Sequence, residues 1–111
     1  KERAKLQQAP LRAPMVIVGI ASHQPHPKVP DQEQTMSAAV GLGYMLVALQ
    51  SSGFGAMWRT GAMAYHPAVA DSLGLAGHES ITGFLYVGTV ASEKPGVPRP
   101  ETSSFVSRWP R

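Results

Sequence analysis

Hydrophobic residues gather in a few runs along the chain, and stretches rich in proline, glycine and polar residues separate these runs. The run PMVIVGIA (14–21) is continuous and rich in β-branched residues, which predicts a buried strand. SITGFLYVGTV (80–90) is rich in β-branched and aromatic residues and predicts another strand. FGAMWRTGA (54–62) predicts a short strand that runs into a turn. The pattern therefore indicates three strands.

The longest predicted element is a helix from about Asp31 to Ser52. Asp31 follows Pro30 and can cap the start, and Gly53 can end the helix in the left-handed conformation. Its apolar residues leave almost no polar face, which is typical of a helix buried in a core or in a membrane. The strongly apolar part is only about 12 residues long, whereas a membrane span needs roughly 20. We therefore expect a buried core helix and no membrane association.

Shorter elements complete the prediction. Residues 1–9 predict the tail of a helix that Pro10 stops, and residues 66–75 predict a short helix with Pro67 at its first position and Gly74 near its end. The segment 22–32, SHQPHPKVPDQ, is rich in proline and predicts a loop. The order strand, long helix, strand, helix, strand indicates an α+β or α/β fold.

The segment from 91 to 111 contains four prolines and has no clear period, so it predicts an extended arm. Phe105, Val106 and Trp109 would expose a large apolar area on such an arm. We expect the arm to lie on another surface, such as that of a second subunit.

Composition and charge narrow the function classes. The chain has 111 residues, a net charge of +3 and 43% hydrophobic residues, which suits one soluble globular unit. It contains no cysteine, which excludes disulfides, thiolate metal sites and cysteine nucleophiles. The basic residues gather near the two ends, a pattern of solvated termini rather than of a nucleic-acid-binding face. These basic residues are Lys1, Arg3, Lys5, Arg12, Arg99, Arg108 and Arg111.

The start of the chain has no apolar stretch of the kind that a secretory signal needs. It begins at Lys1 without an initiator methionine, which suggests a processed product or a piece of a longer protein.

The usual catalytic sets are missing. His23 and His26 are three residues apart, but Pro25 and Pro27 break any helix that could place them on one face, so we expect no metal site. Complete phosphate-loop, dinucleotide and nucleophile-elbow motifs do not occur. The acidic residues fall in predicted loops or at element ends. An enzyme with no such set often relies on a cofactor for its chemistry, and we expect no catalytic side chain.

The segment GFGAMWRTG (53–61) stands out, because its glycines lie beside Trp58 and Arg59. In one interpretation it is a flavin site, where Trp58 walls a flat ring and Arg59 meets an anion. In the other it is a tight turn, with Trp58 plugging the core and Arg59 on the surface. The residues alone do not decide between these two.

Three stretches, APLRAPMVIVGIA, KVPDQEQTMSAAVGLGYMLVALQSSGFGAMWRTGA and ITGFLYVGT, resemble in this order the small FMN-dependent NAD(P)H nitroreductases of the YdjA type. The resemblance covers residues 9 to about 90. It implies the α+β nitroreductase fold, with a mixed or antiparallel sheet and a long buried central helix. Family members are roughly twice as long, so residues 1–111 resemble the C-terminal portion of one such domain, with 91–111 as its arm.

The resemblance also implies a function. Nitroreductases work by a ping-pong mechanism, in which NAD(P)H gives a hydride to flavin N5 and the flavin reduces nitro compounds, quinones or similar small-molecule acceptors. They are cytoplasmic homodimers with FMN at the subunit interface. The resemblance places FMN at Trp58, Arg59, Thr60 and Gly61, with a backbone N–H near Thr60 or Gly61 directed at N5. It places NAD(P) at Ala48, Leu49, Gln50, Ser51, Ser52 and Gly53.

One departure keeps an alternative open. The first half of family members supplies an arginine-rich R-R-S motif and a histidine-containing loop that hold the flavin, and neither occurs in these residues. The alternative is a non-catalytic fragment that acts as a dimerisation or interaction module without bound flavin.

Overall fold

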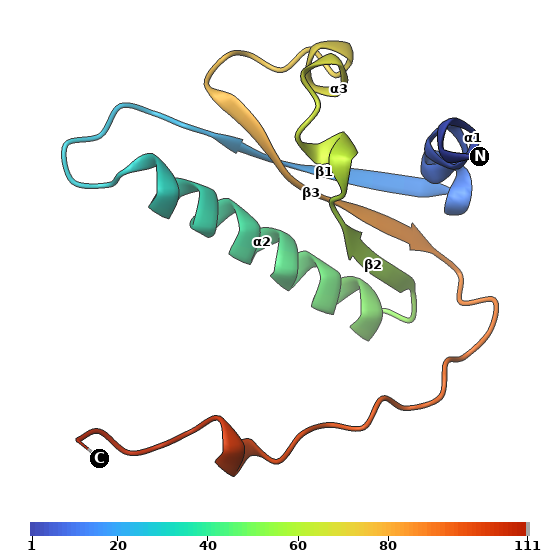
Figure 1. Ribbon diagram of the computed structural model, residues 1–111, viewed down its shortest axis with the longest axis vertical. Coiled ribbons are helices and arrows are strands. Elements are labelled where there is room, and N and C mark those ends of the chain that lie inside the picture. Colours follow the sequence, from blue (N-terminus) through green and yellow to red (C-terminus); the bar gives the residue numbers. More distant parts are fainter. Residues whose placement is uncertain (111) are drawn as a thin grey trace.

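A computed structural model describes residues 1–110 and shows one sheet, one long helix and an extended arm (Figure 1). The order of strands and helices, and the α+β class, are as predicted. The helices and strands are α1 (Glu2–Gln8), β1 (Met15–Ser22), α2 (Asp31–Ser51), β2 (Gly55–Arg59), α3 (Pro67–Ser72) and β3 (Glu79–Gly88). Three short 3₁₀ turns join them, η1 (Ala9–Arg12), η2 (Ala62–Ala64) and η3 (Thr102–Ser104).

The sheet is antiparallel and has the order β1-β3-β2, so β3 is the central strand. This position explains why β3 carries most of the buried residues of the sheet, with Leu85 fully buried. The strand β1 lies at an edge, and the expectation of a buried strand is wrong for it. Only Ala21 of β1 is buried, while Met15 and Ile20 are exposed.

The helix α2 packs across one face of the sheet. Leu42 of α2 forms the core with Leu85 and Val87 of β3. Partly buried residues surround this core, namely Ile17, Leu46, Leu49, Ala56 and Trp58. The opposite side of α2 is exposed, so the helix is buried on one side and not all round as its sequence predicted. The exposed apolar residues on α2 are Met36, Val40, Tyr44, Met45 and Val47.

The cap predicted at the end of α2 is present, and the cap predicted at its start is not. Asp31 is not the N-cap, because Pro30 occupies that position with extended backbone and no side-chain hydrogen bond. Asp31 is the first helical residue, where its negative charge still interacts favourably with the helix dipole. Gly53 follows the helix with φ of 88°, as predicted. The N–H of Phe54 donates to Leu49 O at 3.1 Å, which completes a Schellman turn.

The loop before α2 is held by side chains of that helix. The amide of Gln34 accepts from Gln24 N at 2.9 Å and donates to Gln24 O at 2.9 Å and to Val29 O at 3.0 Å. His23 Nε2 lies 2.7 Å from Thr35 Oγ1. These bonds fix a proline-rich loop that has no regular structure of its own.

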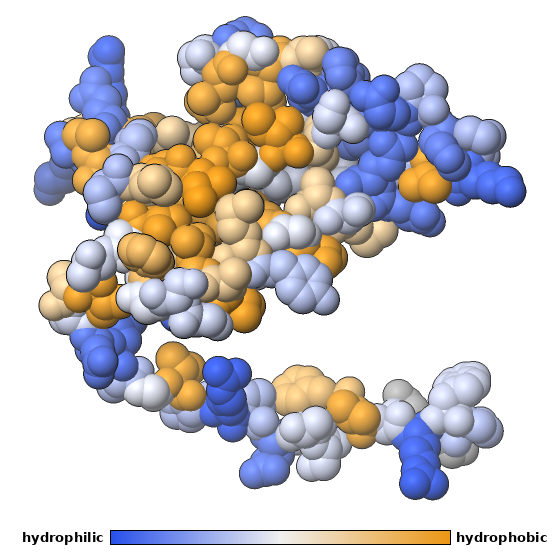
Figure 2. All heavy atoms as spheres, turned by 180° about the vertical axis from the view of Figure 1, so that it is seen from behind, coloured by the Kyte–Doolittle hydropathy of each residue, from blue (hydrophilic) through white to orange (hydrophobic). Residues whose placement is uncertain are grey.

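The arm from Ala91 onward leaves the body and runs alongside it with open space between them (Figures 1 and 2). Its large apolar side chains are exposed, and Trp109 reaches 90% of full exposure. The body of this chain leaves these apolar residues uncovered. Apart from the short turn η3, residues 91–110 have no regular secondary structure.

Trp58 fills the space between α2 and β3. A methyl group at Gly83 of β3 would overlap the indole nitrogen of Trp58. On the other side, a methyl group at Gly43 of α2 would lie 3.7 Å from Cζ3 of Trp58, an ordinary contact. The helix and the sheet therefore approach each other around the indole ring, and glycine is needed at the sheet position.

We expect Gly83→Ala to destabilise the chain by about 1–3 kcal/mol, because the added methyl group overpacks the site of the indole. Gly43→Ala is the matched control, since it adds the same methyl group on the other side of Trp58 without overlap. It should be neutral or stabilise α2 by up to about 1 kcal/mol through helix propensity. Urea unfolding followed by far-UV circular dichroism measures both. Equal midpoints for Gly83→Ala and the wild type would contradict this packing.

Candidate functional site

The strand β2 presents its residues alternately to the two faces of the sheet. Ala56 and Trp58 face α2 and join the core. Met57 and Arg59 lie on the opposite face, where the Nε–H of Arg59 donates to Met57 Sδ at 3.2 Å. Tyr86 of β3 is the register partner of Met57 and shares this face. Sulfur is a weak acceptor, so the guanidinium keeps most of its hydrogen-bonding capacity for other groups.

A first hollow of about 510 Å³ lies between the end of β2 and the N-terminal α1 and η1. Arg59, Thr60 and Gly61 form one wall of this hollow. The facing wall and floor combine apolar and charged residues, Glu2, Lys5, Leu6, Ala9, Arg12, Ala62, Met63 and Tyr86. Its volume lies within the roughly 300–1,000 Å³ that is usual for ligand sites.

Gly61 shapes the wall of the first hollow. Its φ is 68°, in the left-handed region that favours glycine, and open space surrounds the position of a side chain. The Gly61 carbonyl accepts from Ala64 N at 3.2 Å and starts the turn η2. The backbone of residues 60–61 is therefore exposed toward the hollow without a side chain at Gly61 in the way.

A second hollow of about 860 Å³ lies between the turn after α2, the strand β2 and the first residues of the arm. Gln50, Gly53 and Phe54 line it from the turn. Glu93 and Lys94 line it from the arm.

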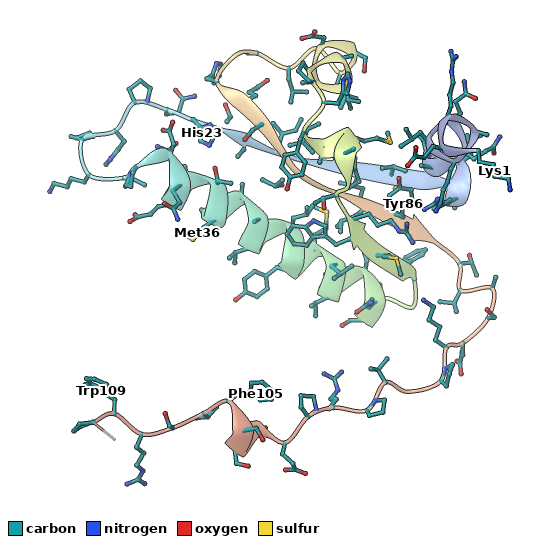
Figure 3. All side chains as sticks on the ribbon, viewed as in Figure 1. Lys1, His23, Met36, Tyr86, Phe105 and Trp109 are labelled. Carbon is teal, nitrogen blue, oxygen red and sulfur yellow. The ribbon has the colours of Figure 1, made fainter. Side chains whose placement is uncertain are left out.

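Arg12, Arg59 and Tyr86 line both hollows, so they form the wall that the two hollows share. In Figure 3, Tyr86 lies on the sheet near the N-terminal helix α1, which follows the labelled Lys1. Each hollow has more basic than acidic side chains along its walls. A concave surface with this excess of positive charge attracts anions.

The profile of the Nitroreductase family matches residues 1–89. The chain belongs to the nitroreductase family. It is 40% identical over 99 residues to the YdjA protein of Escherichia coli strain K12, which carries the name of an NAD(P)H nitroreductase. The same values hold for YdjA of strain O157:H7. These matches cover 86% of this chain and 54% of the relative, so the chain spans about half the length of the curated relatives that it matches.

A crystal structure of a nitroreductase-like family protein from Bacillus cereus has the same fold, with a TM-score of 0.82. The match covers 99% of this chain and 60% of that one, at 22% identity. This similarity shows the nitroreductase fold, as the sequence predicted.

The structure places the residues predicted to contact FMN on two different faces of the sheet. Arg59, Thr60 and Gly61 meet in the first hollow. The side chain of Trp58 is on the other face of the sheet, half-buried in the core. The ring of Trp58 therefore does not line the first hollow, because neighbouring strand residues point to opposite faces, and its predicted contact with FMN stays a prediction.

The stretch predicted to contact NAD(P) is the last turn of α2 and its C-terminal cap. Gln50 and Gly53 line the second hollow. Leu49 packs against the core instead. Ala48, Ser51 and Ser52 are exposed, and Ser52 Oγ donates to Ala48 O at 2.9 Å. The structure therefore brings two of these six residues to a hollow.

Sequence analysis missed Arg12 and Tyr86 as residues of the site. Arg12 was grouped with the solvated basic ends, because nothing in the linear sequence connects it to Arg59. Tyr86 was read only as a strand residue. Side chains alternate between the two faces of β3, and this pattern could have identified Tyr86. It places Tyr86 on the face opposite to the buried Leu85 and Val87.

Among residues 1–110, no group of three histidines, cysteines or acidic residues is placed to hold a metal ion. In the same residues, no helix is long and apolar enough to cross a bilayer. The nitrogen atoms of two histidines serve local structure, since His26 Nδ1 accepts from Lys28 N and Val29 N, and His66 Nδ1 accepts from Ala68 N.

The positions of Trp58 and Arg59 predict effects of very different size on stability. Trp58→Ala should lower the free energy of unfolding by up to about 3 kcal/mol, since it empties the space between α2 and β3. Arg59→Ala should change it by no more than about 0.5 kcal/mol, because Arg59 is exposed. Urea unfolding of the two variants checks this. A large loss of stability for Arg59→Ala would mean that Arg59 is a structural residue of the turn.

Proposed function

We propose that this chain is part of an FMN-dependent oxidoreductase that uses NAD(P)H to reduce nitro compounds, quinones or similar acceptors. One observation carries the proposal. In a chain of the nitroreductase family, Arg59, Thr60 and Gly61 line one hollow, and they belong to the segment in which the family resemblance places FMN.

The residues of the first hollow fit a flavin in chemical type. Leu6, Ala9 and Met63 supply apolar surface for a flat ring. Arg59 supplies a cation for a phosphate or for the negative charge of a reduced ring. The glycine at position 61 leaves backbone accessible at the edge of the hollow.

Bound FMN would supply the hydride and electron transfer between NAD(P)H and the acceptor. The role of this chain is to bind and to orient. The guanidinium of Arg59 would hold the anionic part of the cofactor. An N–H of residues 60–61 would donate a hydrogen bond to the ring, and the apolar wall would exclude water from it. None of these roles requires an acid or a base from the chain.

We further propose that the active species is a homodimer. Met36, Val40, Tyr44 and Val47 recur at helical spacing on the outer side of α2, and Tyr44 is 73% exposed. Phe105 and Trp109 are exposed on the arm. Figure 2 shows hydrophobic side chains gathered over much of the body. Such areas are typical of surfaces that another polypeptide covers.

The second candidate is an interaction module without flavin. The packing of Trp58 in the core favours it, since this removes the most obvious ring-stacking group from the first hollow. The visible absorbance spectrum of the purified protein titrated with FMN separates the two candidates. Saturable binding with a shifted flavin spectrum supports the oxidoreductase, and an unchanged spectrum supports the interaction module.

Arg59→Ala should weaken FMN binding by about 10- to 100-fold, because a charge-assisted hydrogen bond contributes roughly 1.5–3 kcal/mol. Arg59→Lys should restore binding only in part, since an ammonium lacks the planar fork. Arg99→Ala removes a charge from the arm and is the control, which should bind like the wild type. Flavin fluorescence titration measures all three. Affinities within twofold of wild type for Arg59→Ala would refute this role.

Val40→Glu should weaken the homodimer by roughly 30-fold or more, because it places a charge in an apolar interface. Gln32→Glu is the matched control, as it adds the same charge at an exposed position near the start of α2. Sedimentation equilibrium at several concentrations gives the dissociation constants. A wild-type protein that stays monomeric at micromolar concentration would overturn the dimer.

A further inference from the structure

The sulfur atom of Met57 is in contact with a cation at the wall of the candidate site. Met57 is 42% exposed on β2, and its Sδ accepts the Nε–H of Arg59 at 3.2 Å. Met57 lines the second hollow, and Arg59 lines both hollows. The flavin proposal uses the guanidinium of Arg59 but gives no role to the sulfur that holds it.

Oxidation of the sulfur would change the strength of this contact. A thioether sulfur is a weak acceptor, so it holds the guanidinium loosely. Methionine sulfoxide is polar, and its oxygen carries a partial negative charge that makes it a much stronger acceptor for a cationic N–H. Because the guanidinium of Arg59 already lies at Sδ, an oxygen bonded to that sulfur would have a charged donor beside it.

The two lone pairs of Met57 Sδ can serve different partners. One accepts from Arg59, and the other can attack hydrogen peroxide. The sulfur then forms a bond to the near oxygen while the O–O bond breaks. The distal oxygen leaves as hydroxide and takes up the proton that the sulfur-bound oxygen loses, so the sulfur is oxidised to a sulfoxide and the peroxide is reduced to water. A cation beside the sulfur stabilises the negative charge that develops on the leaving oxygen.

Exposure alone does not distinguish Met57 from the other methionines. Met45 on α2 is 43% exposed, which is almost the same as Met57. Among residues 1–110, the methionine sulfur that accepts a hydrogen bond from a cation is that of Met57. Oxidation of Met57 would therefore act on the position of Arg59, and oxidation of Met45 would not.

We infer that Met57 is an oxidation site, and that its sulfoxide oxygen takes the Nε–H of Arg59 and holds the guanidinium against β2. An arginine held in this way has fewer N–H groups for an anion in either hollow. Reduction of the sulfoxide restores the thioether and releases the guanidinium. The consequence for FMN rests on the proposed function, because it requires that Arg59 holds the anionic part of the cofactor.

Proton exchange at the Arg59 Nε–H tests the inference, measured by NMR on the complete 111-residue chain before and after treatment with hydrogen peroxide. Oxidation should slow this exchange about 10-fold, because a charge-assisted bond to oxygen replaces a bond to sulfur. Met57→Leu keeps the apolar volume and should abolish the response. Met45→Leu is the matched control and should respond like the wild type. Met57→Gln supplies a carbonyl oxygen and should slow the exchange without any oxidant.

Peptide mass spectrometry reports which methionines have gained an oxygen. Met57 should be oxidised at least as fast as Met45, and a Met57 that stays a thioether while Met45 is oxidised would overturn the inference. Unchanged exchange at Arg59 once Met57 is a sulfoxide would overturn it as well. An equal slowing of the exchange in Met57→Leu would do the same, because the effect would then come from another residue.

A separate FMN titration tests the consequence for the proposed function. Oxidation should weaken FMN binding about 3- to 10-fold in the wild type and in Met45→Leu, and it should leave Met57→Leu unchanged. An unchanged affinity of the oxidised wild type would overturn this consequence. A wild-type chain that does not bind FMN would refute the flavin proposal, while the exchange rates at Arg59 would still decide the inference on Met57.

Discussion

The packing of the Trp58 indole between α2 and β3 fixes most of the arrangement around the candidate site. The ring occupies space that only glycine leaves free at position 83, and it lies within ordinary contact distance of a methyl group at position 43. Because side chains alternate along a strand, a buried Trp58 puts Arg59 on the opposite face. A shift of one residue in the register of β2 would exchange the two. The same contact therefore specifies which side chain packs in the core and which one faces the hollow.

The sheet order explains how distant segments meet beside Arg59. The central position of β3 places Tyr86 opposite Met57 of β2 and Val16 of β1. The 3₁₀ turn η1 leads directly into β1, so the antiparallel pairing of β1 with β3 carries Arg12 toward Tyr86. The arm leaves the far end of β3 and brings Lys94 to the second hollow. Three basic residues from three parts of the chain thus border one concave surface.

The core is small for the apolar area that the chain carries. Within residues 1–110, six hydrophobic residues are buried, and the outer side of α2 and the arm expose many more. Small domains bury a low fraction of their surface and gain stability when further surface is covered. The chain spans about half the length of its curated relatives. Within the described residues, the outer side of α2 and the arm therefore remain large exposed apolar areas.

The sequence alone determined the elements, because local signals specify them. Gly53 and Gly74 end their helices with positive φ, and β-branched runs form β1 and β3. It also located the glycine-rich segment that contains Arg59. Burial depended on the tertiary structure. An apolar run has the same pattern whether it lies at the edge or the centre of a sheet, so β1 and α2 are less buried than predicted. The packing of Trp58 in the core required the facing helix and strand, and the placement of Arg12 and Arg59 along the same hollows required the strand order. These contacts join residues far apart in the sequence, and no local pattern encodes them.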